Sequence, residues 1–212
     1  MEALIRAHTV VARPPLVPEL ELHLVTADCP LWRADEAELA RLGLPEPYWA
    51  FAWPGGQALA RHILDHPEEV RGRRVLDFGA GGGIEALAAA RVGAADVLAT
   101  DLDPLAIEAC RMNARLNGLA LRATTEDVLG RTELDADLVL VGDVTYADPL
   151  AGRVLTWMKA LADLGIDVWV ADPGRGFLDA SRLEPLASYE APSDVDVDGR
   201  YRVTTSVCRL RR

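Results

Sequence analysis

Acidic side chains follow several apolar segments of this chain, and glycines surround the first of them. The run 75–83, Val-Leu-Asp-Phe-Gly-Ala-Gly-Gly-Gly, is typical of a buried strand that enters a glycine loop. Gly79 and Gly81 lack Cβ, so the backbone there can turn sharply and approach a ligand. Asp101 ends a second apolar segment, where a carboxylate can accept hydrogen bonds from two ribose hydroxyls. These residues indicate a strand–helix–strand unit that binds a nucleoside.

Asp77 helps to decide which nucleoside derivative is bound. A dinucleotide loop accepts a pyrophosphate, which a carboxylate just before the first glycine would repel. S-adenosylmethionine (SAM) carries a sulfonium and an ammonium group and no phosphate, so an acid suits it. Ile84 also stands where the dinucleotide pattern has its third glycine. We therefore predict SAM as cofactor and S-adenosylhomocysteine (SAH) as product, with Asp77, Gly79, Gly81 and Asp101 at the binding site. A nicotinamide or flavin cofactor and a glycine turn without ligand are the alternatives.

Two further acids follow later apolar segments. Asp127 would accept a hydrogen bond from the adenine amino group while Val128 packs on the ring, and a solvated loop acid is the alternative. Asp143 comes directly after the segment 136–142, where a methyl acceptor would stand, so it could hold or partly desolvate an amine. Tyr146 could wall the channel or simply pack within its loop. Ligands of doubly wound sheets bind beyond the carboxyl ends of the strands, so we expect these acids to converge there.

An aromatic, turn-rich segment precedes the glycine loop. Trp49, Phe51 and Trp53 alternate at period two, which favours a half-buried edge segment, while their faces could also attract a cation. We predict Trp49 in the substrate site and Trp53 at the cofactor, together with Leu102. Arg175, in a turn after the segment 167–171, is expected to contact the substrate, with a structural turn as the alternative.

Strands and helices alternate along most of the chain. We expect strands at 74–78, 96–100, 121–125, 136–142, 167–171, near 188–194 and at 201–210, and helices at 57–64, 84–92, 104–117, 149–164 and 179–187. This alternation predicts an α/β, Rossmann-like sheet that is mostly parallel, with helices on both faces. A hairpin turn at Asp198 and Gly199 would place one antiparallel strand in it. We expect this domain at 47–212, after an N-terminal extension at 1–46 with a strand at 20–25 and a short helix at 35–41.

Composition restricts the partners. The 212 residues are half hydrophobic and carry a net charge of −11, which argues against nucleic acid. No apolar run approaches the ~20 residues of a membrane span. The three cysteines are far apart and show no metal or disulfide spacing, and His62 and His66 have no evident third ligand. We expect no metal, no nucleic acid and no membrane, and we expect a monomer.

Five runs in the middle of the chain resemble a known family. They read Pro-Tyr-Trp-Ala-Phe-Ala-Trp-Pro-Gly-Gly-Gln-Ala-Leu at 47–59, Val-Leu-Asp-Phe-Gly at 75–79, Asp-Leu-Asp-Pro at 101–104, Gly-Asp-Val-Thr-Tyr at 142–146 and Asp-Pro-Gly-Arg at 172–175. In this order they resemble the lysine methyltransferases that modify the β-subunit of electron transfer flavoprotein. The SAM loop is shared by a huge superfamily, whereas Trp-Pro-Gly-Gly-Gln, Asp-x-x-Tyr and Asp-Pro-Gly-Arg are much narrower.

The resemblance implies the seven-stranded SAM-methyltransferase fold, SAM as methyl donor and lysine ε-amino groups of electron transfer flavoprotein β-subunit as acceptors. Mitochondrial relatives have a transit peptide, and none is clear here. The expected compartment is therefore a bacterial cytoplasm, or the mitochondrial matrix if the chain is eukaryotic.

We predict Asp143 and Tyr146 as the catalytic residues, Asp143 orienting the amine and Tyr146 shaping the channel, without assigning either as general base. Asp143 is also expected to contact SAM, and Tyr146 to contact the substrate. A small-molecule N-methyltransferase with a nicotinamide-like acceptor, or a ribosomal-protein methyltransferase of the same fold, is the main alternative. Asp77 argues against an oxidoreductase, and Asp143 and Tyr146 argue against an inactive binding module. Only the family resemblance separates a protein acceptor from a small one.

Overall fold

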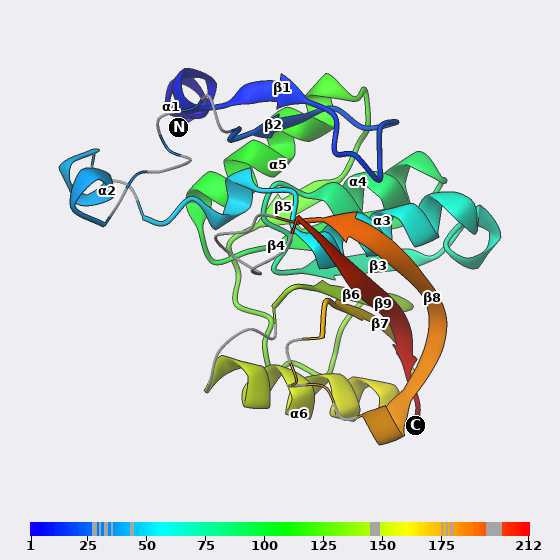
Figure 1. The fold of residues 1–212 in the computed structure, drawn as a ribbon. Helices are drawn as coiled ribbons and strands as arrows, with labels where there is room; N and C mark the ends of the chain where they lie inside the picture. Colours follow the sequence, from blue (N-terminus) through cyan, green and yellow to red (C-terminus); the bar gives the residue numbers. More distant parts are fainter. Residues whose placement is uncertain are drawn as a thin grey trace.

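The computed structural model describes residues 1–26, 29, 31, 34, 36–42, 45–144, 149–174, 176, 178, 180–193 and 201–212. Its centre is a seven-stranded sheet with the order β5-β4-β3-β6-β7-β9-β8 (Figure 1). The strands are β3 Arg74–Phe78, β4 Asp96–Thr100, β5 Arg122–Thr124, β6 Leu138–Gly142, β7 Asp167–Asp172, β8 Leu183–Pro192 and β9 Arg202–Leu210.

The strand directions confirm the predicted sheet. The five strands from β5 to β7 are parallel, and β9 runs antiparallel to both of its neighbours, β7 and β8. The chain starts the sheet in its middle at β3, moves outward through β4 to β5, and returns to place β6 on the other side of β3. The order therefore reverses beside β3, and the carboxyl ends of β3, β4 and β6 form the crevice that binds ligands in such sheets.

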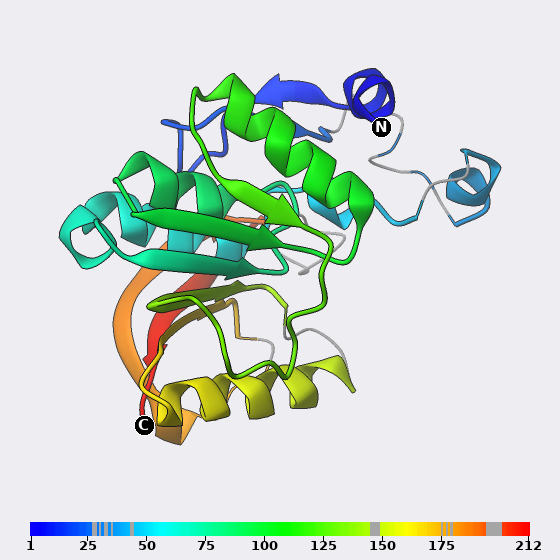
Figure 2. The same cartoon turned by 180° about the vertical axis from the view of Figure 1, so that it is seen from behind.

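Helices cover both faces of the sheet, as expected from the alternating pattern (Figures 1 and 2). One face carries three helices, α3 Pro54–Asp65, α4 Ile84–Arg91 and α5 Pro104–Leu116, and the other carries α6 Leu150–Asp163. Alternate residues of β6 supply the two cores: Leu138 and Leu140 pack with the first group of helices, and Val139 and Val141 pack with α6. Strands buried on both faces read as continuous apolar runs, which is why their positions were predicted closely.

The N-terminal region packs onto the α5 side of the sheet. It contains α1 Glu2–His8, β1 Val10–Ala12, β2 Leu22–Leu24, α2 Glu36–Leu42 and the 3-10 turn η2 Tyr48–Ala50. The strand and the short helix expected in this region are confirmed, while α1 and β1 were not foreseen. Strands β1 and β2 form a separate antiparallel pair, and Leu20, Leu22 and Leu24 belong to the main core. The division at residue 46 stays a prediction.

Two predicted elements were wrong. The helix at 179–187 is only a 3-10 turn, η4 Ala180–Arg182, after which β8 begins at Leu183. Pro185 disfavours a helix at that place, and β8 instead pairs with β9 from Leu183 to Pro192, with a register shift beside Pro185. The aromatic segment is not an extended edge, because η2 leads through a short link into α3. The predicted turn at 198–199 lies outside the described residues.

Candidate active site

A cleft of about 750 Å³ opens at the carboxyl ends of β3, β4 and β6. It brings together most of the predicted site residues: Trp49, Trp53, Gly79, Gly81, Asp101, Leu102, Asp127, Val128 and Asp143. Tyr146 and Arg175, predicted to contact the substrate, lie outside the residues that the structure describes.

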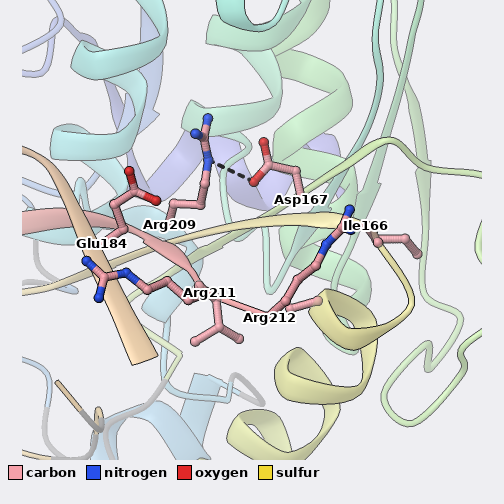
Figure 3. A pocket seen from close by; sticks show the side chains of 9 residues that line it. Ile166, Asp167, Glu184, Arg209, Arg211 and Arg212 are labelled. Carbon is pink, nitrogen blue, oxygen red and sulfur yellow. Dashed lines mark hydrogen bonds and ion pairs between the residues drawn. The ribbon is translucent and has the colours of Figure 1, made fainter. Parts of the chain in front are cut away.

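A second cavity of about 460 Å³ lies at the opposite end of the sheet (Figure 3). It is lined by charged side chains from the start of β7, the start of β8 and the end of β9, among them Asp167, Glu184 and Arg209. Arg209 Nε donates to Asp167 Oδ1 at 3.1 Å. None of the predicted site residues lines this cavity, and it faces the amino end of β7. The cleft at the carboxyl ends is therefore the candidate site.

Asp101 holds the glycine loop from the side of β4. Gly81 N donates to Asp101 Oδ2 at 2.9 Å, and Asp103 N donates to Oδ1 at 2.9 Å. The loop is also tied to β4 by Gly79 N, which donates to Thr100 O at 2.9 Å. Burial raises the pKa of Asp101 above its ordinary value. Each carboxylate oxygen has a second lone pair, so Asp101 can brace the loop and still accept from ribose hydroxyls.

Asp77 lies beneath the glycine loop and is 1% exposed, so it does not line the cleft itself. Its Oδ2 accepts a hydrogen bond of 2.9 Å from Ala86 N in the first turn of α4. Burial raises the pKa of Asp77 to about 7, and the neighbouring Asp101 charge adds to the rise. Asp77 thus holds the first turn of α4 directly after the glycine loop, and its role toward SAM stays a prediction.

Glu85 is a second buried acid that the sequence analysis did not identify. It is 5% exposed, and burial followed by the Asp77 and Asp143 charges raises its pKa well above the ordinary value. Two adjacent buried carboxyl groups do not both ionise readily, so Asp77 and Glu85 share a proton. The available signal was a charged residue within the otherwise apolar helix Ile-Glu-Ala-Leu-Ala-Ala-Ala at 84–90.

Asp143 is held at the start of α3. Its backbone is left-handed, with φ of 53°, and Gly56 N in the first turn of α3 donates to its Oδ2 at 3.0 Å. A Cβ on Gly55 would lie 2.8 Å from Asp143 Cγ and 2.9 Å from Ala171 O, so only glycine fits there. The Trp-Pro-Gly-Gly-Gln run therefore contacts the Asp-x-x-Tyr motif. Gly55 leaves space for the Asp143 carboxylate, and Gly56 donates a hydrogen bond to it.

The aromatic segment forms a wall of the cleft. Trp49 is 3% exposed, and its backbone packs on the glycine loop, since a Cβ on Gly82 would lie 2.9 Å from Trp49 O. The ring of Trp53 lies 5.5 Å from that of Phe51 and 6.0 Å from that of Tyr48, and its Nε1 donates to Tyr48 O at 2.8 Å. Packing explains the segment, and the substrate role of Trp49 stays a prediction.

The remaining predicted residues also line the cleft. Leu102 is 68% exposed, which leaves its side chain available to pack on a ligand. Asp127 Oδ1 accepts from Leu129 N at 2.9 Å, and Val128 is buried beside it. Asp103 is the N-cap of α5, because its Oδ1 accepts from Leu105 N at 2.8 Å.

The chemistry of the cleft fits SAM. Asp101, Asp127 and Asp143 line the cleft together with two glycines of the loop, and among the described lining residues Arg153 is the one basic side chain. The Gly81 N–H that a phosphate would use already donates to Asp101. Exposed Leu102 offers an apolar surface for a purine. The described residues contain no cluster of side chains that could hold a metal ion, and no described helix is long and apolar enough to cross a membrane.

Fold and site together define a SAM-dependent methyltransferase. The ribosomal protein L11 methylase of Lactobacillus delbrueckii subsp. bulgaricus superposes with a TM-score of 0.50 at 20% identity, covering 74% of this chain and 80% of that chain. The Pyrococcus abyssi tRNA (uracil-54, C5)-methyltransferase in complex with S-adenosyl-L-homocysteine gives 0.51 at 18% identity, covering 71% and 38%. At these identities the solved structures support the fold alone.

Sequence relatives define the family. The family model "Ribosomal protein L11 methyltransferase (PrmA)" matches residues 58–156. The electron transfer flavoprotein beta subunit lysine methyltransferase of Xenopus laevis is 42% identical over 205 residues, 94% of this chain and 82% of the relative. The Danio rerio protein of the same name is 38% identical over 203 residues, 93% and 77%. The chain belongs to the electron transfer flavoprotein β-subunit lysine methyltransferase family, and it is a SAM-dependent protein-lysine methyltransferase.

Proposed function

We propose that this chain methylates lysine ε-amino groups of the β-subunit of electron transfer flavoprotein. The hydrogen bond from Gly56 N to Asp143 Oδ2 carries this proposal, because it joins two of the family-specific motifs of the chain, and Asp143 lines the cleft. Two relatives named for this substrate match 94% and 93% of the chain.

The cleft residues would hold SAM in distinct ways. Asp101 would accept from the ribose hydroxyls, and Asp127 from the adenine amino group, while Leu102, Val128 and Trp53 would pack on apolar parts of the ligand. The buried Asp77 would favour the cationic groups of SAM through its charge. When bound, SAM supplies an electrophilic methyl group on its sulfonium.

Asp143 would position the acceptor amine. A lysine with a reference pKa of ~10.4 is mostly protonated at neutral pH, so it must lose a proton to water before it can react. A carboxylate fixed by Gly56 N can accept a remaining N–H and aim the lone pair toward the methyl carbon, at a near-attack distance of about 3–3.5 Å. Asp143 thus orients the amine, and it does not need to take up the proton that the lysine loses to water. Tyr146 would line the channel, with Trp49 and Arg175 at the substrate side.

The charge of the enzyme suits a cationic acceptor. The net charge is −11, and the lining of the cleft includes Glu46, Glu126 and Asp127. Such a surface attracts a lysine-bearing segment and raises its rate of encounter. We propose that the enzyme works in a bacterial cytoplasm and as a monomer. Light scattering would check the monomer against the chain mass of 22.9 kDa.

Radiolabelled SAM would test the substrate. The purified enzyme would be incubated with electron transfer flavoprotein from its own source, with ribosomal protein L11 in parallel, and with a whole lysate. Label confined to the β-subunit, and lost when its labelled lysines are replaced by arginine, is the expected result. Label on L11, or on no protein despite SAH binding by calorimetry, would overturn the substrate proposal in favour of a ribosomal or a small-molecule acceptor.

A further inference from the structure

Asn113 of α5 joins the N-terminal strand β2 to the glycine loop. Its side chain is 0% exposed. Its Oδ1 accepts from His23 N at 2.8 Å and lies 2.9 Å from His23 Nδ1, and its Nδ2 donates to Gly82 O at 2.9 Å. The backbone N–H of His23 can only donate and the carbonyl of Gly82 can only accept, so the orientation of the amide is determined.

Gly82 depends on this contact. The preceding loop residues are tied to β4 and its end, since Gly79 and Ala80 donate to Thr100 O and Gly81 donates to Asp101. At Gly82 the described structure offers the Asn113 amide as partner of the carbonyl, and a Cβ on Gly82 would lie 2.9 Å from Trp49 O and 3.3 Å from Asn113 Nδ2. The second half of the loop is therefore held from α5, and α5 in turn holds β2.

We propose that Asn113 is a positioning residue for the SAM loop, and that through it the β1–β2 pair, residues 10–24, contributes to the affinity for SAM. A loop held in its binding conformation needs no reorganisation when the ligand arrives, which favours binding. Coupling of this kind is reciprocal, so the bound ligand must also stabilise the contact between Asn113 and His23.

Asn117 provides a matched control on the same helix. Its Oδ1 accepts from Glu21 N at 3.0 Å and its Nδ2 donates to Glu21 O at 2.7 Å and to Asn113 O at 2.8 Å. It thus bridges the same N-terminal strand segment with the same amide chemistry. None of its described hydrogen bonds reaches the glycine loop.

The first test compares Asn113→Asp with Asn117→Asp. Asn113→Asp keeps an acceptor for His23 but places an oxygen against Gly82 O, so we expect the SAH dissociation constant to rise about tenfold. The kcat at saturating SAM should change less than about twofold, since only ligand binding is affected. Asn117→Asp should change both values less than about twofold. Equal rises in the dissociation constant for both variants, or none for Asn113→Asp, would overturn the proposal.

The second test uses the full wild-type chain and does not depend on the variants folding. Hydrogen–deuterium exchange with and without SAH should show slower exchange in peptides spanning 10–24. The change is measured relative to α6 on the opposite face of the sheet, which controls for global stabilisation by the ligand. No added protection of 10–24 beyond that of α6 would refute the coupling even if Asn113→Asp does not fold.

Discussion

Replacing Gly55 by alanine should separate the position of Asp143 from the rest of the cleft. The new Cβ would lie 2.8 Å from Asp143 Cγ, whereas carbon atoms in contact prefer about 3.5–4.0 Å, so the carboxylate must retreat by roughly 0.7–1.2 Å. The same Cβ would lie 2.9 Å from Ala171 O, which belongs to the central strand β7 and cannot move easily. Whether the carboxylate or the start of α3 shifts, Gly56 N and Asp143 Oδ2 separate.

A displacement of about 1 Å in a positioning group can cost on the order of 100-fold in rate, so we expect kcat to fall by about that factor. This corresponds to roughly 2.7 kcal/mol of activation free energy. The SAH dissociation constant should change little, because Asp101 and the glycine loop lie elsewhere in the cleft. The overpacking should also lower the free energy of unfolding by about 1–3 kcal/mol.

Steady-state methylation of the β-subunit at saturating SAM, together with calorimetric SAH titration and thermal unfolding, measures these quantities. Gly152→Ala in α6 is the matched control, since its Cβ would meet nothing within 4 Å and alanine is the better helix former. If Gly55→Ala is folded and keeps its kcat within about twofold, the position of Asp143 is not what the reaction requires. If SAH affinity falls as much as kcat, the substitution has damaged the whole cleft.

Three further outcomes are expected. Asp143→Ala should lower kcat by at least about 100-fold while SAH still binds in calorimetry, and equal loss of both would remove its catalytic assignment. Asp101→Asn should weaken SAH binding by about 10- to 100-fold, because a charge-assisted acceptor is lost, and unchanged affinity would exclude its contact with the ligand. The raised pKa of the buried Asp77–Glu85 pair means that the folded state gains stability from the shared proton at acid pH. That gain is lost as pH rises from the ordinary value of 3.8 toward about 7. Glu85→Gln removes one of the two acids. The melting temperature of this variant should therefore exceed the wild-type value by more at about pH 8 than at about pH 5. A difference in melting temperature that does not depend on pH would contradict the shared proton.

The sheet could be predicted where its strands are buried on both faces. β3 and β4 were predicted to the residue, because apolar runs bounded by turns have few other interpretations. β8 was not, because it lies at the edge and its burial pattern mixes exposed and half-buried residues. Its conformation depends on pairing with β9, which becomes apparent only in the folded sheet.

The sequence predicted that several acids would lie together at one edge of the sheet, but it did not predict the contacts between them and other elements. Asp101 and Asp143 could be predicted because acids at strand ends converge at one edge of a parallel sheet. The contact between Gly56 and Asp143 spans 87 residues of sequence and depends on where α3 begins relative to β6. Glu85 resembled a helix-surface charge, because local sequence does not show that β6 covers that turn of α4.

The N-termini of α3, α4 and α5, which cover one face of the sheet, explain how several acidic side chains can lie close together. Asp143, Asp77 and Asp103 each accept a hydrogen bond from a backbone N–H in the first turn of α3, α4 and α5 respectively. Helix N-termini carry partial positive charge, so each offsets part of the repulsion among these carboxylates and Asp101. The offset is incomplete, because burial still raises the pKa values of Asp77 and Asp101. A ligand with a sulfonium and an ammonium group would supply the missing positive charge, whereas a phosphate would add to the repulsion. The charges around the cleft therefore favour a cationic methyl donor over a phosphate-bearing cofactor.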